Sequence, residues 1–171
     1  MTPEHQHLVL NHIPIIGSAC AILPLVAGFY LRNAGLLLTG LLLAAVCGWT
    51  TPFVMESGEE AEHRYEMGAV RPYLDAHAED FVEEHGERAE KGSKVMYVSA
   101  ILATICLVAA RWCWPVARWG ALVVAVACLM AMMAGIWIAD AGGKIRRVDF
   151  REGGGAVSAE GQPAEGQADE H

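Results

Sequence analysis

The sequence predicts an all-α integral membrane protein, a four-helix bundle with an amphipathic surface helix between its second and third spans. The chain has 171 residues, of which 54% are hydrophobic. Its apolar residues come in unbroken runs of roughly 20, the length of a bilayer-crossing helix, rather than at the periods of a soluble domain. Very short polar turns follow the first and third runs, which favours two antiparallel hairpins.

Each span has an identifiable boundary in the sequence. The first contains Pro24, which a membrane helix tolerates when neighbouring groups satisfy the freed carbonyl, and it ends at the tight turn Arg32-Asn33. The second ends near Pro52. Aromatic and basic residues around Trp112 are typical of a membrane interface and separate the third and fourth spans. The predicted spans are about 13–31, 34–53, 95–114 and 119–139, within one domain of residues 1–151.

Small residues recur at every fourth position of two spans, the spacing that closely packed membrane helices use. The series are Gly40, Ala44 and Gly48 in the second span, and Ala127, Ala131, Gly135, Ala139 and Gly143 in and after the fourth. The five cysteines include no Cys-x-x-Cys pair, so c-type haem attachment and zinc knuckles are excluded. These features predict helix packing rather than chemistry.

The polar segment between the second and third spans carries a helical pattern. Val70, Leu74, His77, Phe81 and His85 recur at steps of three and four, with acidic residues mostly elsewhere. We expect an amphipathic helix over about 69–90 that lies along the membrane surface. The tail, 152–171, is acidic and almost without bulky apolar residues, so we expect it to be disordered.

All seven histidines are predicted on one side of the membrane, because four spans return both termini and the central segment to the same face. They are His5, His7, His12, His63, His77, His85 and His171. His77 and His85 are eight residues apart, about 12 Å along a helix, too far to ligate one haem iron together. His12, at the start of the first span, is the partner we expect across the mouth of the bundle.

Four short segments resemble the predicted membrane proteins called domain of unknown function 2231. They are Asn11-His12-Ile13-Pro14-Ile15, Ser57-Gly58-Glu59-Glu60-Ala61-Glu62, Glu84-His85-Gly86-Glu87-Arg88-Ala89 and Gly142-Gly143-Lys144-Ile145-Arg146. The resemblance covers about residues 7–150. It implies four membrane helices and no agreed activity, and it puts the family's motif histidines at His12 and His85. Gly86 departs from the acidic residue expected there.

Three functions follow as hypotheses. The first is an accessory membrane subunit of a larger electron-transfer complex, with other membrane subunits as partners. The second is a b-type cytochrome-like carrier with haem b at one membrane face, ligated among His12, His85, His77 and His63. Its apolar slot would be lined by Phe29, Phe53, Phe81, Met55 and Tyr97. The third is a metal-binding membrane protein that uses His12 and His85; His5-Gln6-His7 with clustered Glu is a further copper, nickel or zinc motif.

The net charge of -8 argues against nucleic acid as a partner and permits a cationic c-type cytochrome. If haem is bound, a quinone is a further possible partner for electron exchange. No hydrolytic motif occurs, which favours a protein that is not an enzyme on its own. We expect a multi-pass protein of a bacterial-type inner membrane. Arg32 follows a span with no preceding Lys or Arg, which favours a periplasmic histidine side, although the raw count of basic residues favours the opposite.

Overall fold

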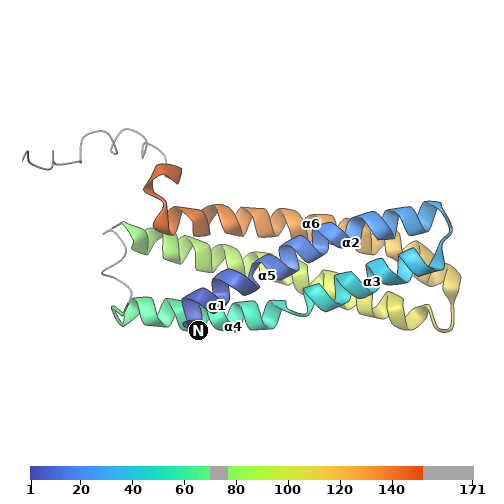
Figure 1. Cartoon of the computed structure of the whole chain (residues 1–171), viewed down its shortest axis with the longest axis horizontal. Coiled ribbons are helices and arrows are strands. Elements are labelled where there is room, and N and C mark those ends of the chain that lie inside the picture. The colour runs from blue at the N-terminus through green and yellow to red at the C-terminus, as the bar shows by residue number, and fades with distance from the viewer. Residues whose placement is uncertain (70–76, 152–171) are drawn as a thin grey trace, which may run out of the picture.

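The computed structural model describes residues 1–69 and 77–151 (Figure 1). Within these ranges the chain is all-helical, which confirms the predicted fold class. The helices are α1 (Pro3–Leu10), α2 (His12–Tyr30), α3 (Ala34–Gly48), α4 (Thr51–Glu66), α5 (Ala78–Ala109) and α6 (Trp114–Arg146), followed by a short 3-10 turn, η2 (Val148–Phe150). Helices α1 and α2 run on almost continuously, as do α3 and α4, so four long rods result.

All four rods are long and apolar enough to cross a membrane. They cover Pro3–Tyr30, Ala34–Glu66, Ala78–Ala109 and Trp114–Arg146. The two longest, each of 33 residues, reach about 50 Å at 1.5 Å per residue, whereas the hydrocarbon core is only about 30 Å thick. The rods must therefore project from the membrane, and the apolar stretches within them form the membrane-spanning segments.

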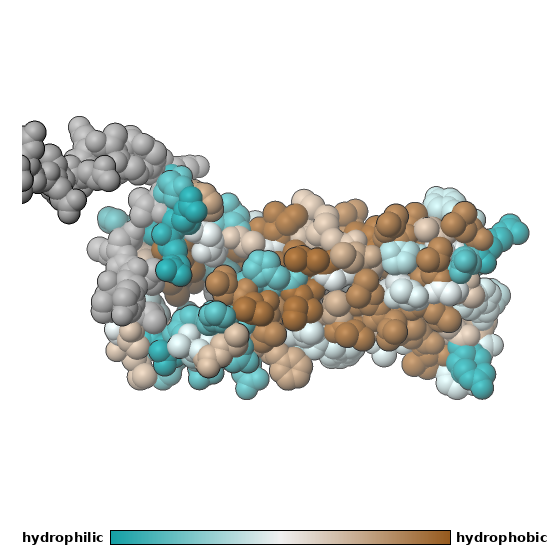
Figure 2. All heavy atoms as spheres, viewed as in Figure 1, coloured by the Kyte–Doolittle hydropathy of each residue, from teal (hydrophilic) through white to brown (hydrophobic). Residues whose placement is uncertain are grey.

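The projecting part lies at the end where α1 and α4 sit. Figure 2 shows apolar side chains over the body of the bundle and polar ones gathered around α4 and the end of α6. We call the layer formed by α1, α4 and residues 78–94 and 140–147 the polar extension. Exposed Leu23, Leu42, Ile105 and Val126 give the rest a surface suited to lipid.

The two turns at the opposite end close the hairpins tightly, as expected for both of them. Arg32 adopts φ 53° there, and the Asn33 side chain accepts a 3.1 Å hydrogen bond from the backbone N–H of Leu36, capping α3. The second turn comes earlier than expected, because α5 ends at Ala109 and α6 begins at Trp114 rather than near 119. Pro115 occupies the first helical turn, where its missing N–H costs nothing.

The predicted surface helix is only partly within the described residues, since 70–76 lie outside them. From Ala78 onward, the predicted stretch forms the first turns of α5 and continues without a break into the third span. Ion pairs at (i, i+4) spacing support the helix across this junction; they join Glu84 to Arg88, Glu87 to Lys91 and Glu90 to Lys94. The predicted tail, 152–171, also lies outside the described residues.

The core of the spanning part is built from small residues and a few leucines. Gly40, Ala44 and Gly48 of α3 are all buried, as their spacing predicts. A Cβ atom on Gly48 would lie 2.8 Å from the Ala100 Cβ, so α3 and α5 approach closely there. In α6 the stripe is only partly buried, because Ala139 is exposed. Close packing of this kind replaces the hydrophobic effect inside a bilayer.

Candidate functional site

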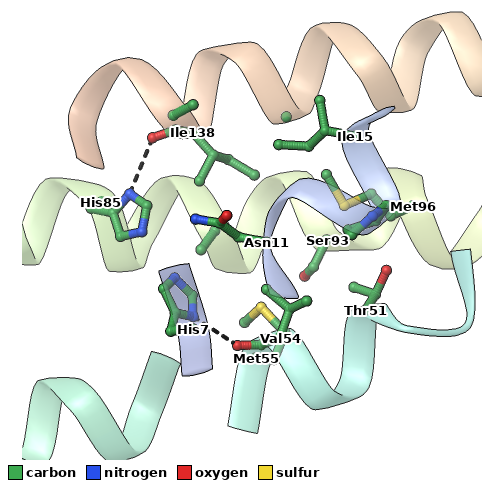
Figure 3. Close-up of a pocket in the computed structure, with 14 residues that line it drawn as sticks. His7, Asn11, Ile15, Thr51, Val54, Met55, His85, Ser93, Met96 and Ile138 are labelled. Carbon is green, nitrogen blue, oxygen red and sulfur yellow. Dashed lines mark hydrogen bonds between the residues drawn. The ribbon is translucent and has the colours of Figure 1, made fainter. Parts of the chain in front are cut away.

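Two histidines from different hairpins meet where the polar extension joins the spanning part. The ring centroids of His7 in α1 and His85 in α5 are 6.0 Å apart, with the ring planes at 88°. Both line a cavity of about 50 Å³. The other lining residues are Asn11, Pro14, Ile15, Thr51, Val54, Met55, Ala89, Ser93, Met96, Gly135, Ile138 and Ala139. In Figure 3 the two rings lie toward one end of this set, and Thr51 and Met96 toward the other.

The His7 ring is held by α4. Its Nδ1 donates a 3.0 Å hydrogen bond to the carbonyl oxygen of Val54, and the Ser57 hydroxyl lies 3.4 Å from the same nitrogen. One turn beyond Val54, Gly58 leaves room for the ring, because a Cβ atom there would stand 3.0 Å from His7 Cε1. A glycine and a carbonyl four residues apart thus form a cradle for one imidazole.

The His85 ring is held by α6 in the same way. Its Nδ1 donates a 3.1 Å hydrogen bond to the carbonyl oxygen of Ile138. Four residues on, a Cβ atom at Gly142 would stand 3.0 Å from His85 Cε1. Each hairpin therefore carries a histidine on its first arm and a carbonyl–glycine cradle on its second. Two such units facing each other make a site that neither hairpin forms alone.

The two hydrogen bonds fix the tautomer of both rings. A carbonyl oxygen can only accept, so each Nδ1 carries the proton and each neutral ring keeps its lone pair on Nε2. Burial lowers the pKa of His7 and of His85 below the ordinary value of 6.5, which favours the neutral form. Imidazoles that ligate metals have this arrangement, with the second ring N–H donated to a backbone carbonyl.

Asn11 contributes an unsatisfied polar atom to the same cavity. Its Oδ1 is buried and has no hydrogen-bond partner among the described residues. The residue lies between α1 and α2, and Figure 3 shows its amide at the His85 end of the cavity. A buried oxygen without a partner costs about 1–3 kcal/mol. A ligand that accepted its lone pair would recover this cost.

The four histidines that the sequence predicts as cofactor ligands lie in different environments in the structure. His85 lines the cavity, but the ring beside it is that of His7, whereas His12 is exposed and its Nδ1 donates to the Leu8 carbonyl at 2.9 Å. His63 lies at the exposed end of α4, 3.8 Å from the Glu66 carboxylate. His77 is exposed at the start of α5. A cofactor role for any of these residues stays a prediction.

The predicted haem slot is not assembled from the five residues that were expected to line it. Of the five, Met55 alone lines the cavity. Phe29 lies at the opposite end of the bundle against Trp119, Phe53 is exposed, and the Arg151 guanidinium lies over the ring of Phe81. Pockets for cofactor-sized ligands measure about 300–1,000 Å³, so a cavity of about 50 Å³ suits an ion better than a macrocycle.

Within residues 1–69 and 77–151, no group of three or more His, Cys, Asp or Glu side chains is placed to hold a metal ion. A metal ion at the cavity would therefore bind the two imidazoles and take its other ligands from side chains other than His, Cys, Asp and Glu. No protein family model matches the chain, and no curated protein or solved structure is similar enough to it to support an assignment. The resemblance to domain of unknown function 2231 stays a prediction from its motifs.

Acid should weaken the packing of the two histidines. Because the pKa values of both imidazoles in the folded state lie below 6.5, the unfolded chain takes up protons at a higher pH than the folded chain. The free energy of unfolding is therefore not reduced by these two groups above pH 6.5, and they lower it as the pH falls below that value. We expect the melting temperature to fall between about pH 7 and pH 5, and the His7→Gln/His85→Gln variant to show a flatter profile.

Glu62 provides a control of opposite sign. Burial raises the pKa of its carboxyl above 4.5, with Glu66, Glu59 and Glu83 adding repulsion, so the folded state gains stability as Glu62 takes up a proton. Glu62→Gln should therefore steepen the decline in acid. A histidine double variant with the same profile as the unmodified protein would contradict the assignment. Thermal unfolding in detergent, monitored by circular dichroism across this pH range, compares the unmodified protein, the histidine double variant and Glu62→Gln.

Proposed function

We propose that this chain is a multi-pass membrane protein that binds one transition-metal ion between His7 and His85 at one face of the bilayer. The observation that carries the proposal is the pair of facing cradles, each of which leaves a neutral imidazole with its Nε2 lone pair beside a shared cavity. Two metal–nitrogen bonds of about 2 Å, plus the distance from each nitrogen to its ring centre, span about 6 Å. The observed centroid separation of 6.0 Å suits one ion between the rings.

Metal stoichiometry in variants tests this function. The purified protein in detergent, stripped of metal and titrated with Cu(I) or Zn(II), should retain about one equivalent after desalting. His7→Ala and His85→Ala should each weaken binding by about 100-fold or more, since even outer-shell changes cost 10–100-fold. His12→Ala is the matched control, because this exposed imidazole lies five residues from His7 and outside the cavity.

A protein that binds no metal, or that loses binding only when His12 is replaced, would refute the proposal. An absorption spectrum of the same preparation provides a separate result. A reduced-minus-oxidised b-type band that disappears in the His7 and His85 variants would show that the site binds haem b and not a metal ion alone. Metal-independent co-purification with other membrane proteins would instead favour the accessory-subunit hypothesis.

We place the His7–His85 face outside the cytoplasm, in the periplasm of a bacterial-type inner membrane. The support is the positive charge of Arg32 directly after the first span. Thiol labelling of intact cells tests it with two single-cysteine proteins. Cys113 lies exposed in the turn between α5 and α6, and Glu60→Cys lies exposed on α4 at the other end. A membrane-impermeant reagent should label Glu60→Cys and spare Cys113; the reverse pattern would invert the topology.

A further inference from the structure

The side-chain donor atoms that the described residues bring to the cavity are all uncharged. Besides the two imidazoles, they are the Asn11 amide, the hydroxyls of Thr51 and Ser93, and the thioethers of Met55 and Met96. Among the residues that the structure describes, no carboxylate and no thiol belongs to the lining. The Thr51 hydroxyl donates to the Gly48 carbonyl at 2.7 Å and the Ser93 hydroxyl to the Glu90 carbonyl at 3.1 Å. The two hydroxyls have their protons engaged and offer an ion only neutral, hard oxygen atoms, so the softer donors of the lining are imidazole nitrogen and thioether sulfur, beside the Asn11 amide oxygen.

This set suits few metal ions. Ca²⁺ and Mg²⁺ take carboxylate and carbonyl oxygens, of which the lining offers one amide. Structural Zn²⁺ is held by four ligands drawn from Cys, His and carboxylates, and only two residues of those types are present. Uncharged donors also leave the full charge of a bound ion unbalanced, and the cost of burying that charge is lower for a monovalent ion than for a divalent one.

Thioethers select one ion from those that remain. Sulfur donors from Met and Cys favour Cu(I), and imidazole binds copper as well. Met55 follows Val54 on α4, so the Met55 side chain comes from the same turn of α4 as the carbonyl that holds His7. Figure 3 shows the Met55 side chain at the same end of the cavity as His7. Asn11 Oδ1 supplies a weak additional donor.

We infer that the ion is Cu(I), bound by His7 and His85 with the Met55 thioether as the soft ligand. This inference rests on the proposed function and names the ion for the same site. Met55 then coordinates the ion through its sulfur atom, a role that an apolar side chain of the same size cannot fill. An isosteric replacement should therefore keep the fold and change the affinity for one metal only.

Competition against a chromogenic Cu(I) chelator, under anaerobic reducing conditions, measures the affinity. We expect one equivalent of Cu(I), a weaker response to Zn(II), and a loss of about tenfold or more in Cu(I) affinity for Met55→Leu. Leu replaces Met with little change in volume, so the packing is retained. Met130→Leu is the matched control, because Met130 is exposed on the lipid-facing surface of α6.

The outcomes separate the two proposals. Binding of Zn(II) in preference to Cu(I), still dependent on His7 and His85, would overturn the copper inference and leave the metal site in place. Unchanged Cu(I) affinity in Met55→Leu would remove Met55 from the ligand set and overturn the inference as stated. Absence of binding by either ion would end both. A sulfur scattering contribution in the X-ray absorption spectrum of the Cu(I) protein, lost in Met55→Leu, would support the assignment directly.

Discussion

Gly28→Ala should destabilise the protein by about 2 kcal/mol or more, the usual cost of overpacking a rigid contact. Gly28 is buried in α2, one turn before the tight turn at Arg32. A Cβ atom there would lie 2.6 Å from the backbone nitrogen of Leu37 and 2.9 Å from its Cα. Backbone atoms cannot rotate away as a side-chain tip does, so the first hairpin must open at its turn.

Gly86→Ala gives the matched control for this loss. The nearest atom to a Cβ at Gly86 is a Glu62 carboxylate oxygen at 3.5 Å, an ordinary contact on the polar extension. Alanine also favours helix by about 1 kcal/mol relative to glycine, so this variant should be neutral or more stable. Thermal unfolding of both proteins in one detergent provides the comparison. Equal melting temperatures would show that α2 and α3 do not pack as closely as the structure places them.

Gly142→Val should abolish the histidine site while leaving the spanning bundle intact. A Cβ atom at Gly142 would already stand 3.0 Å from Cε1 and Nδ1 of His85, and the two valine methyl groups would extend into the space of the ring. The imidazole would then leave the Ile138 carbonyl. We expect a fall in metal affinity of about 100-fold and a loss of about 1–3 kcal/mol in stability.

Gly143→Val is the matched control for Gly142→Val. At Gly143, a Cβ atom would lie 3.2 Å from the Phe150 ring, and no His85 atom is among its close neighbours. Gly143→Val should therefore disturb η2 and keep the metal. If both variants bound metal equally well, the carbonyl–glycine cradle would have no role in positioning His85. Chemical shifts of the histidine ring carbons would show whether the ring has moved.

The helix faces that carry His7 and His85 follow a helical periodicity in the sequence. Steps of three and four back from the buried Met96 lead through Gly92 and Ala89 to His85. The same steps back from the buried Leu25, through Ala21, Ser18, Pro14 and Asn11, lead to His7 rather than to His12. His12 instead continues the exposed stripe of Ile16 and Leu23. The expectation for His12 rested on its place at the start of the first span and not on this register.

The sequence by itself determined the number of spans, the short turns and the placement at one end of the six histidines that the structure describes. These depend on the length and order of apolar runs, because the bilayer requires a helix of fixed length and every helix must return the chain to the other face. Only the tertiary structure decided that the faces carrying His7 and His85 meet, and which groups hold the two rings. His7 is 47 residues from its carbonyl at Val54, and His85 is 53 residues from Ile138. Contacts at such separations depend on the rotation and axial offset of packed helices, which side-chain packing across the whole bundle sets and no local pattern records.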